Sequence, residues 1–165
     1  MQITNIRTGK SVEVHDSSSI NNIQIGDNVK IAKRCSLFGS ADNILEIGSD
    51  SYIGMNTILN GYAAKLKIGS NVSIGQNVNI MTNSGPNASE ILQRIFPVIE
   101  GEVIIGDHTW IGASVIITPG VEIGDFCIIG ANSFVTSSFP SYSIIGGTPA
   151  KLLRMLTKEE IDKLK

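Results

Sequence analysis

The sequence predicts an all-β protein whose chain winds into a parallel β-helix. Isoleucine and valine are abundant beside 17 glycines, and aromatic residues make up only 5% of the chain. This balance favours short strands and turns over helices. A six-residue motif, in which glycine or another small residue follows an aliphatic residue, recurs from Ile25 onward, for example as IGDNVK, IGSNVS and IGDHTW. Such periodicity is typical of a β-helix, because each hexad supplies one short strand and one corner.

The spacing of the hexads gives the shape of one coil. Ile105 and Ile123 hold equivalent places 18 residues apart, so that three hexads make a triangular coil. The three intervals before Ile105 are 22, 21 and 37 residues long, which implies insertions of 4, 3 and 19 residues after the third hexad of each coil. We expect these insertions to lie along one edge, and the longest, within residues 81–104, to form a loop over a site.

The first and fifth places of the hexad are expected to point inward. The fifth place holds small or thin side chains, namely Val29, Cys35, Thr57, Val72, Val78, Val115, Cys127 and Ser133. We therefore interpret Cys35 and Cys127 as buried structural thiols. Two cysteines so far apart do not predict a disulfide framework.

The sixth place faces outward, but it carries apolar side chains on two sides of the prism. They are Tyr52, Trp110 and Ile128 on one side, and Ile58, Ile116 and Phe134 on the next. Contiguous apolar patches are normally covered by a partner, and two adjacent patches suit a closed ring better than a two-fold pair. The sequence therefore favours a homotrimer, with a C-terminal segment folded over these strips as the alternative.

The chain is expected to form a single domain, residues 1–165, with an irregular start at residues 1–24. In this segment only Val12, Val14 and Ile20 suit the inward places of an imperfect first coil. The coiled pattern is therefore expected to become regular after this segment.

A C-terminal extension is expected over residues 137–165. Pro140 and Pro149 interrupt regular strands there, because proline cannot donate a backbone hydrogen bond. Thr157 and Glu160 have the spacing of a capping box, which predicts a short helix. We expect this helix to cap the solenoid.

The charge of the chain limits its partners. The formal net charge is -2 and Lys and Arg residues are not clustered, which argues against nucleic acid or an anionic membrane as the main partner. A small molecule is the expected ligand. The sequence has no charged and apolar leader and no run of 18 apolar residues, so a cytoplasmic location is expected.

The stretch from Ile105 to Arg154 resembles the hexapeptide-repeat acyltransferases, in particular the sugar O-acetyltransferases of the maltose, galactoside and capsule type. The likeness is carried by DHTWIG, by the turn PGV and by the exit GGTPAK. It implies a left-handed β-helix, a homotrimer, and acetyl-CoA bound in a groove between neighbouring subunits without a metal. The implied reaction moves an acetyl group to a hydroxyl of a sugar or nucleotide sugar, with surface polysaccharide metabolism as the expected setting.

The same resemblance assigns residues to the acetyl-CoA groove. Small residues that let the pantetheine arm approach the backbone match Ala113, Ala131 and Thr136, although β-helix corners need small residues in any case. Lys151 and Arg154 match basic residues that meet the CoA phosphates, and their charge suits that task. The alternative is that these two side chains are simply solvated.

Trp110 matches a tryptophan that lines the acceptor and thioester end of the groove, and its alternative role is to pack the trimer. Asn83, Ser84 and Asn87 in the long loop are candidates for hydrogen bonds to the acceptor. A loop so rich in Asn, Ser and Gly is also explained by turn formation alone.

Acetyl transfer to a hydroxyl needs a base, and a histidine suits this at neutral pH. The resembling enzymes carry it on the long loop, at a position that matches Gly85. The two histidines of this chain are His15, in the irregular start, and His108. His108 is the candidate replacement base because it lies two residues from Trp110, and a surface histidine without a role is the alternative.

Two functions remain open at this point. The first is a CoA-dependent sugar O-acetyltransferase, and the second is a catalytically silent trimeric binding or scaffold protein, which Gly85 favours. The zinc hydratases that share this fold need three histidines on one metal, and two histidines cannot supply them.

Overall fold

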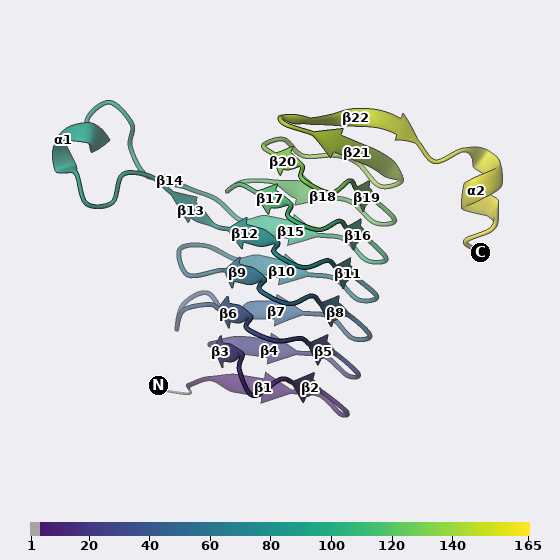
Figure 1. The fold of residues 1–165 in the computed structure, drawn as a ribbon, viewed down its shortest axis with the longest axis horizontal. Coiled ribbons are helices and arrows are strands. Elements are labelled where there is room, and N and C mark those ends of the chain that lie inside the picture. Colours follow the sequence, from purple (N-terminus) through teal and green to yellow (C-terminus); the bar gives the residue numbers. More distant parts are fainter. Residues whose placement is uncertain (1–3) are drawn as a thin grey trace.

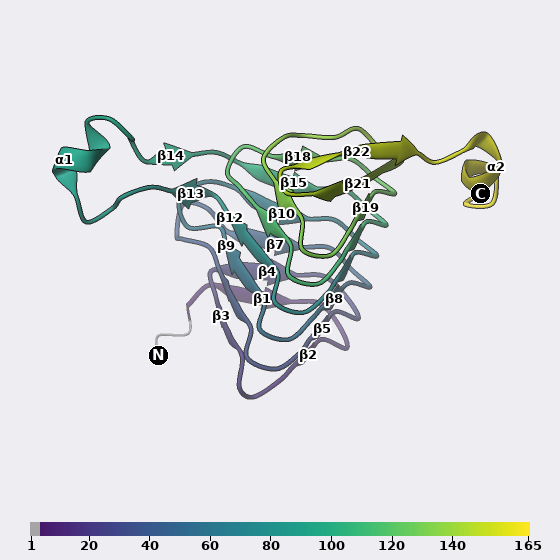
Figure 2. The ribbon, with the colours of Figure 1, turned by 45° about the horizontal axis from the view of Figure 1, so that its top comes forward.

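The computed structural model describes residues 4–165 and is the parallel β-helix that the repeat predicts, with the left-handed sense that the family resemblance implies. Six coils stack along one axis, and their strands form the three sides of a triangular prism (Figures 1 and 2). We name the sides A, B and C in chain order, and the corners between them AB, BC and CA.

Each coil contributes one short strand to each side, and each strand pairs in parallel with its equivalent in the next coil. Side A contains β1 (Ile6–Thr8), β4 (Ile23–Ile25), β7 (Leu45–Ile47), β10 (Leu66–Ile68), β15 (Val103–Ile105) and β18 (Glu122–Ile123). Side B contains β2 (Glu13–Val14), β5 (Lys30–Ile31), β8 (Tyr52–Ile53), β11 (Ser73–Ile74), β16 (Trp110–Ile111) and β19 (Ile128–Ile129), followed by β21 (Ser143–Gly147) and β22 (Ala150–Met155). Side C contains β3 (Ser19–Asn21), β6 (Ser36–Phe38), β9 (Ile58–Asn60), β12 (Asn79–Met81), β17 (Ile116–Ile117) and β20 (Phe134–Val135).

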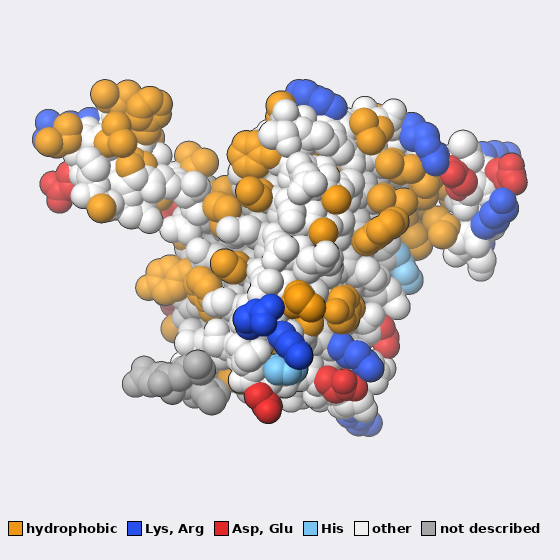
Figure 3. Space-filling model, in the orientation of Figure 1, with side chains coloured by type: hydrophobic (Ala, Val, Ile, Leu, Met, Phe, Trp, Pro, Cys, Tyr) orange, Lys and Arg blue, Asp and Glu red, His pale blue; other side chains and the backbone are white. Residues whose placement is uncertain are grey.

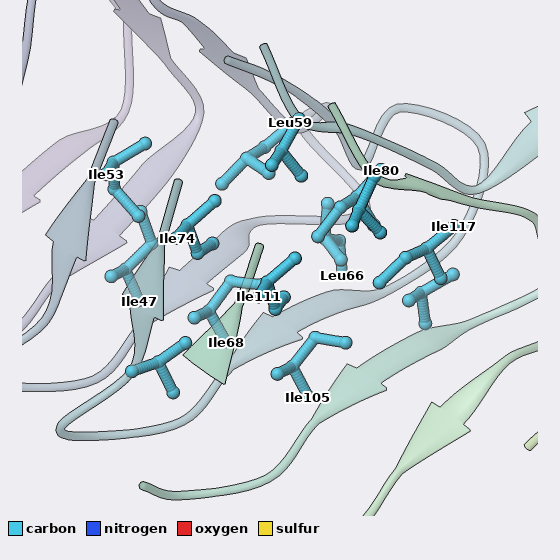
Figure 4. Packing of buried hydrophobic residues seen from close by; sticks show 14 of the residues in the cluster. Ile47, Ile53, Leu59, Leu66, Ile68, Ile74, Ile80, Ile105, Ile111 and Ile117 are labelled. Carbon is cyan, nitrogen blue, oxygen red and sulfur yellow. The ribbon is translucent and has the colours of Figure 1, made fainter. Parts of the chain in front are cut away.

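The first two places of the hexad follow from the stacking of coils. The aliphatic first place points into the prism, where Ile47, Ile68 and Ile105 lie one above another in register (Figure 4). The second place must be small, because a Cβ on Gly48 would lie 2.5 Å from the carbonyl carbon of Gly69 in the next coil. The small residue at the second place is therefore required by the close approach of successive coils.

The next two places form the corners. At corner AB the third place is Asp or Ser in most coils, and its side chain accepts a backbone N–H of a neighbouring coil. Asp125 Oδ1, for example, lies 2.7 Å from the backbone N of Asp107. The fourth place has a left-handed backbone, with φ of 56° at Asn28 and 58° at Asn132. Asparagine is frequent there because it tolerates this conformation better than most residues.

The fifth place points inward, as predicted. Its residues are all buried, including both free cysteines, Cys35 and Cys127. Burial raises the pKa of the Cys127 thiol, and its Sγ donates to the carbonyl of Pro140 at 3.3 Å. The thiols therefore serve the packing of the prism.

The first coil begins earlier than the sequence pattern indicates. Residues 6–21, within the segment expected to be irregular, form a full coil in which Ile6 pairs with Ile23 and Glu13 with Lys30. The inward residues of this coil are partly buried and pack against the core. Alternating apolar residues are sufficient here, because a terminal coil has a neighbour on one side only.

The C-terminal end is closed by a hairpin and not by the predicted helix. Strand β21 pairs in parallel with β19, and β22 returns antiparallel to β21. Helix α2 (Lys158–Asp162) forms with the predicted capping box between Thr157 and Glu160. It lies beyond the prism, as Figure 1 shows at the right, so the expectation that it caps the solenoid was wrong. The hairpin takes that role because its strands continue side B.

Candidate functional site

All three insertions lie at corner CA, as predicted. They occupy residues 39–44, 61–65 and 82–102, between the last strand of side C in one coil and the first strand of side A in the next. The longest forms an arm, which starts and ends in an antiparallel ladder of β13 (Asn83–Ser84) and β14 (Ile99–Glu100). Beyond the ladder it carries α1 (Glu90–Gln93), and Figures 1 and 2 both show α1 away from the coils.

The tip of the arm is apolar and uncovered. Ile91 is 74% exposed and Ile95 is 72% exposed, and Figure 3 shows hydrophobic side chains gathered at the end of the arm. No residue of α1 is buried. Because so short a helix gains its stability from packing, we expect the tip to contact another molecule.

Gly85 lies where the arm leaves its ladder, and although it is exposed, its backbone lies close against Val98. A Cβ at this position would lie 2.7 Å from the Cα of Val98 and 3.0 Å from its Cγ2. Ser84 pairs with Ile99, so Gly85 and Val98 are the next facing residues of the two chain segments. The neck of the arm therefore requires glycine at position 85 on packing grounds.

The polar residues predicted to meet the acceptor lie at this neck. Asn83 is partly buried, and its Oδ1 accepts a hydrogen bond from Nδ2 of Asn60 at 3.5 Å. Ser84 is exposed. The N–H of Asn87 donates to the carbonyl of Gly85 at 2.9 Å, which is turn formation. Asn83 and Ser84 remain candidates for contact with an acceptor, whereas Asn87 shapes the arm.

Trp110 lies on side B, which is the side opposite corner CA in a triangular prism. The residue is 58% exposed, and its neighbours along the side are Ser73 and Ile128. Tyr52, two strands below, is also exposed. Within one chain the body of the prism separates Trp110 from the arm. A site that contains both therefore needs two copies of the chain.

Corner BC carries most of the residues expected along the CoA groove. Ala113 and Ala131 hold the same place in successive coils, and Lys151 lies opposite Gly146 in the hairpin above them. Thr136 follows β20 and lies at corner CA, on a different edge. The fold thus places two small residues and one lysine along one edge, and separates Thr136 from them.

Arg154 is already engaged by an acidic residue. Its Nη1 and Nη2 donate to the two carboxylate oxygens of Glu160, at 2.7 and 2.9 Å. Glu160 also accepts the backbone N–H of Thr157 at 2.7 Å. These hydrogen bonds, that from Arg154 first, lower the pKa of the Glu160 carboxyl to about 2. A CoA phosphate that uses Arg154 has to compete with this carboxylate.

The pKa of Glu160 gives a test of this contact. The carboxyl loses its proton more readily in the folded chain than at its ordinary value of 4.5, so the contact is complete above pH 4.5 and is lost as the pH falls towards 2. A carboxyl-carbon NMR titration should show Glu160 titrating near 2. In Arg154→Gln the pKa should rise but stay below its ordinary value, because the backbone N–H of Thr157 still donates to the carboxylate. An unchanged pKa in that variant would contradict the assignment.

His108 is part of a stack of aromatic rings at corner AB. Its ring lies parallel to that of Phe126 with centroids 4.7 Å apart, and Phe126 stacks on Tyr142 at 5.5 Å. All three have the left-handed backbone of the fourth place. Among residues 4–165, neither ring nitrogen of His108 has a hydrogen-bond partner, so no residue orients it as a base.

We expect His108→Ala to keep the acyl-transfer rate within about threefold of the wild type, because loss of a positioned base costs ~10²- to 10⁴-fold and this ring is not positioned as one. The variant should lose about 0.5–1.5 kcal/mol of stability with the ring stack. Steady-state kinetics and urea unfolding measure the two effects. A rate loss of a hundredfold with intact folding would restore His108 as the base.

The aromatic stack was missed at the sequence level, although a signal for it exists. His108, Phe126 and Tyr142 are spaced at 18 and 16 residues, close to one coil. Rings at that spacing meet because successive coils are one strand spacing apart.

Two absences complete the description of the site. Among residues 4–165, no three His, Cys, Asp or Glu side chains are placed to hold a metal ion. Within the same residues, no helix has the length and apolar character needed to cross a membrane.

A β-helix of hexads with an arm on one edge is the architecture of proteins built from hexapeptide repeats. Residues 102–137 match the family described as bacterial transferase hexapeptide (six repeats). A Saccharomyces cerevisiae protein named "Putative acetyltransferase YJL218W" is 33% identical over an alignment 171 residues long, which covers 94% of this chain and 84% of the relative. The chain belongs to the hexapeptide-repeat acyltransferase family.

A second relative has a more specific name. The galactoside O-acetyltransferase of Escherichia coli K12 is 35% identical over 124 residues, which are 74% of this chain. The aligned part spans only 59% of the length of that enzyme.

Solved structures with the same fold include both O- and N-acyltransferases. A point mutant of AntD, an N-acyltransferase from Bacillus cereus in complex with dTDP and coenzyme A, has a TM-score of 0.82 and 27% identity, covering 97% of this chain and 88% of its own. A maltose O-acetyltransferase from Clostridium difficile 630 has a TM-score of 0.63 and 28% identity, covering 92% and 70%.

Proposed function

We propose that the protein transfers an acetyl group from acetyl-CoA to a sugar acceptor, at a groove between two copies of the chain. The observation that carries the proposal is the match to AntD, which extends over 97% of this chain and includes a complex with coenzyme A and dTDP. In this proposal the pantetheine follows corner BC past Ala113 and Ala131, and Lys151 meets a CoA phosphate. Trp110 of one copy and the arm of the next enclose the thioester.

Gly85 favours an amine over a hydroxyl as the acceptor. A neutral amine attacks the thioester carbonyl without prior loss of a proton, whereas a hydroxyl needs a positioned base. The nitrogen forms the C–N bond, the C–S bond breaks, and the thiolate of CoA takes up the proton that the nitrogen releases. The products are an amide and free CoA, and the arm has only to position the acceptor.

A sugar hydroxyl is the second candidate acceptor, as the resemblance to O-acetyltransferases implies. The galactoside O-acetyltransferase at 35% identity favours it. In either case the proposed setting is the synthesis of surface polysaccharide precursors in the cytoplasm.

The apolar surfaces support a trimer as the working form. Side B exposes Trp110 and Tyr52, and side C exposes Ile58, Ile116 and Phe134. The C-terminal segment does not fold over these strips in the way the alternative required, since α2 lies beyond the prism (Figure 1). We propose that a second copy covers them and receives the arm. Light scattering coupled to size-exclusion chromatography tests this with a mass three times 17.6 kDa.

Release of free thiol from acetyl-CoA, measured with paired amino and hydroxy nucleotide sugars, tests the function. Turnover with the amino sugar and at least a hundredfold slower turnover with its hydroxy partner is expected. Faster turnover with the hydroxy sugar would select the second candidate. CoA binding without turnover on either panel would favour the silent scaffold.

A further inference from the structure

The second insertion and the root of the arm are joined by hydrogen bonds at corner CA. Strand β9 ends at Asn60, which pairs with Met81 at the end of β12 in the next coil (Figure 1). The backbone N–H and the hydroxyl of Thr82 both donate to the carbonyl of Asn60, at 3.0 and 3.1 Å. The backbone N–H of Ala64, in the second insertion, donates to the Thr82 hydroxyl at 3.3 Å. Residues 61–65 and the root of the arm are therefore fixed to each other.

The side chain of Asn60 extends this connection to the polar neck of the arm. Its Oδ1 accepts the backbone N–H of Tyr62 at 3.1 Å, and its Nδ2 donates to Oδ1 of Asn83 at 3.5 Å. Both asparagines are partly buried. One amide thus links the second insertion to a residue that is a candidate for contact with the acceptor.

These contacts determine which way the amide of Asn83 faces. A backbone N–H can only donate, so the atom of Asn60 beside Tyr62 must be the oxygen. The Asn60 nitrogen then faces Asn83, and because an amide nitrogen only donates, the facing atom of Asn83 must be its oxygen. The two N–H groups of Asn83 therefore point away from Asn60. Among residues 4–165 they donate to no acceptor.

Two unpaired amide donors beside the arm suit an oxygen of the acceptor. Hydroxyl, carbonyl and carboxylate oxygens accept hydrogen bonds, whereas a protonated amine has no lone pair to offer. A neutral amine that attacks the thioester needs its lone pair for the new C–N bond. The donors of Asn83 therefore suit an oxygen substituent next to the reacting group, and not a reacting nitrogen.

We propose that Asn60 is a positioning residue, which fixes the Asn83 amide with both donors toward an oxygen of the acceptor in the groove between two copies. The proposal rests on the proposed function, because the acceptor and the groove are those of the acyl-transfer site. Asn60 acts only through Asn83 and does not touch the acceptor. The contact is made in the bound acceptor and in the transition state alike, so it lowers the KM of the acceptor and leaves kcat unchanged.

Asn60→Asp is expected to reverse the Asn83 amide while it keeps the bond to Tyr62. One carboxylate oxygen still accepts the Tyr62 N–H, and the other, which can only accept, replaces the donor that faced Asn83. The Asn83 amide must then rotate, so that its Nδ2 donates to residue 60 and its Oδ1 faces the groove. In proton–nitrogen correlation spectra of asparagine-labelled protein, one Nδ2 proton of Asn83 should move downfield and exchange with solvent more slowly.

Asn56→Asp is the matched control at corner BC. Asn56 makes the same two kinds of bond, since it accepts from Nε of Arg34 at 2.8 Å and donates to Oδ1 of Asn77 at 3.0 Å. Its substitution should change the amide signals of Asn77 and leave those of Asn83 and the acceptor KM as in the wild type. Circular dichroism shows whether both variants keep the fold.

Steady-state thiol release, with acetyl-CoA saturating and the fastest nucleotide sugar of the panel varied, tests the role in recognition. Reversal leaves an acceptor oxygen against an amide oxygen, so Asn60→Asp should raise the acceptor KM by about tenfold, with kcat and the KM of acetyl-CoA unchanged. In an Asn83→Ala background the same substitution should have no further effect, because the side chain through which it acts is gone. A purely structural role of Asn60 would cost as much in that background as in the wild type.

The outcomes separate this inference from the proposed function. Asn83 amide signals that are unchanged in Asn60→Asp overturn the inference, whatever the activity. A reversed amide with an unchanged acceptor KM overturns the role in recognition, and so does a fall in kcat alone, which would place the donors on the thioester oxygen. Where no sugar turns over in the wild type, the proposed function fails and the role in recognition fails with it, while the spectra still show whether Asn60 orients Asn83.

Discussion

Gly85→His is expected to lower acetyl transfer by roughly 10²-fold, although it restores the residue that the resembling enzymes carry. The reason is the neck of the arm, where a Cβ on residue 85 would lie 2.7 Å from the Cα of Val98. That contact is with backbone, so a side-chain rotation does not relieve it. The two segments of the neck must separate, and the arm then loses its position against the neighbouring copy.

The measurement is the rate of thiol release with the best amino sugar, together with limited proteolysis of the arm. Ala88→His is the matched control, because residue 88 is exposed beyond the neck. It should keep the wild-type rate and protease resistance. A Gly85→His variant that is faster than the wild type, on either acceptor, would show that the arm accepts a histidine base there.

Ile111→Ala is expected to reduce the free energy of unfolding by about 2–5 kcal/mol. Ile111 is fully buried at the first place of a hexad in the fifth coil, and it stacks between Ile74 and Ile129. Figure 4 shows Ile111 among the aliphatic side chains that fill the prism. Truncation leaves a cavity with coils above and below, and those coils cannot close it without losing their own pairing.

Urea unfolding followed by circular dichroism measures this loss. Ile111→Val, which removes one methyl group, is the graded control and should cost about 0.5–1.5 kcal/mol. A loss below about 1 kcal/mol for Ile111→Ala would mean that the coils collapse onto the cavity, against the rigid stacking described here.

The fold was largely predictable because each place of the hexad has a single dominant physical cause. Inward aliphatic residues such as Ile68 and buried fifth-place residues such as Cys127 are determined by packing between adjacent coils. The first coil was missed because it departs from the hexad at corner BC. His15 stands at the second place, where the other coils have Gly or Ala, and Ser17 at the fourth place does not have the left-handed backbone. The capping role expected of α2 was wrong because a helix pattern predicts that a helix forms but not the surface on which it docks.

The site was less predictable, because its residues are related through space and across copies. The family resemblance assigns Trp110 and the position of Gly85 to the same groove. Only the folded prism shows that the two residues lie on opposite sides of one chain. The ion pair of Arg154 with Glu160 depends on how β22 leads into α2. The need for glycine at position 85 depends on Val98, a contact across a neck that no local pattern encodes.

The first coil has one further consequence, for the order in which the molecule comes apart. Strands β1, β2 and β3 each have a single partner strand. At the other end β18 and β20 also have a single partner, but side B continues there into the β21–β22 hairpin. In a stack held by nearest-neighbour contacts, opening begins at the end with fewer contacts and advances one layer at a time. Backbone amides should therefore exchange with solvent fastest at residues 6–21 and progressively slower towards the middle coils.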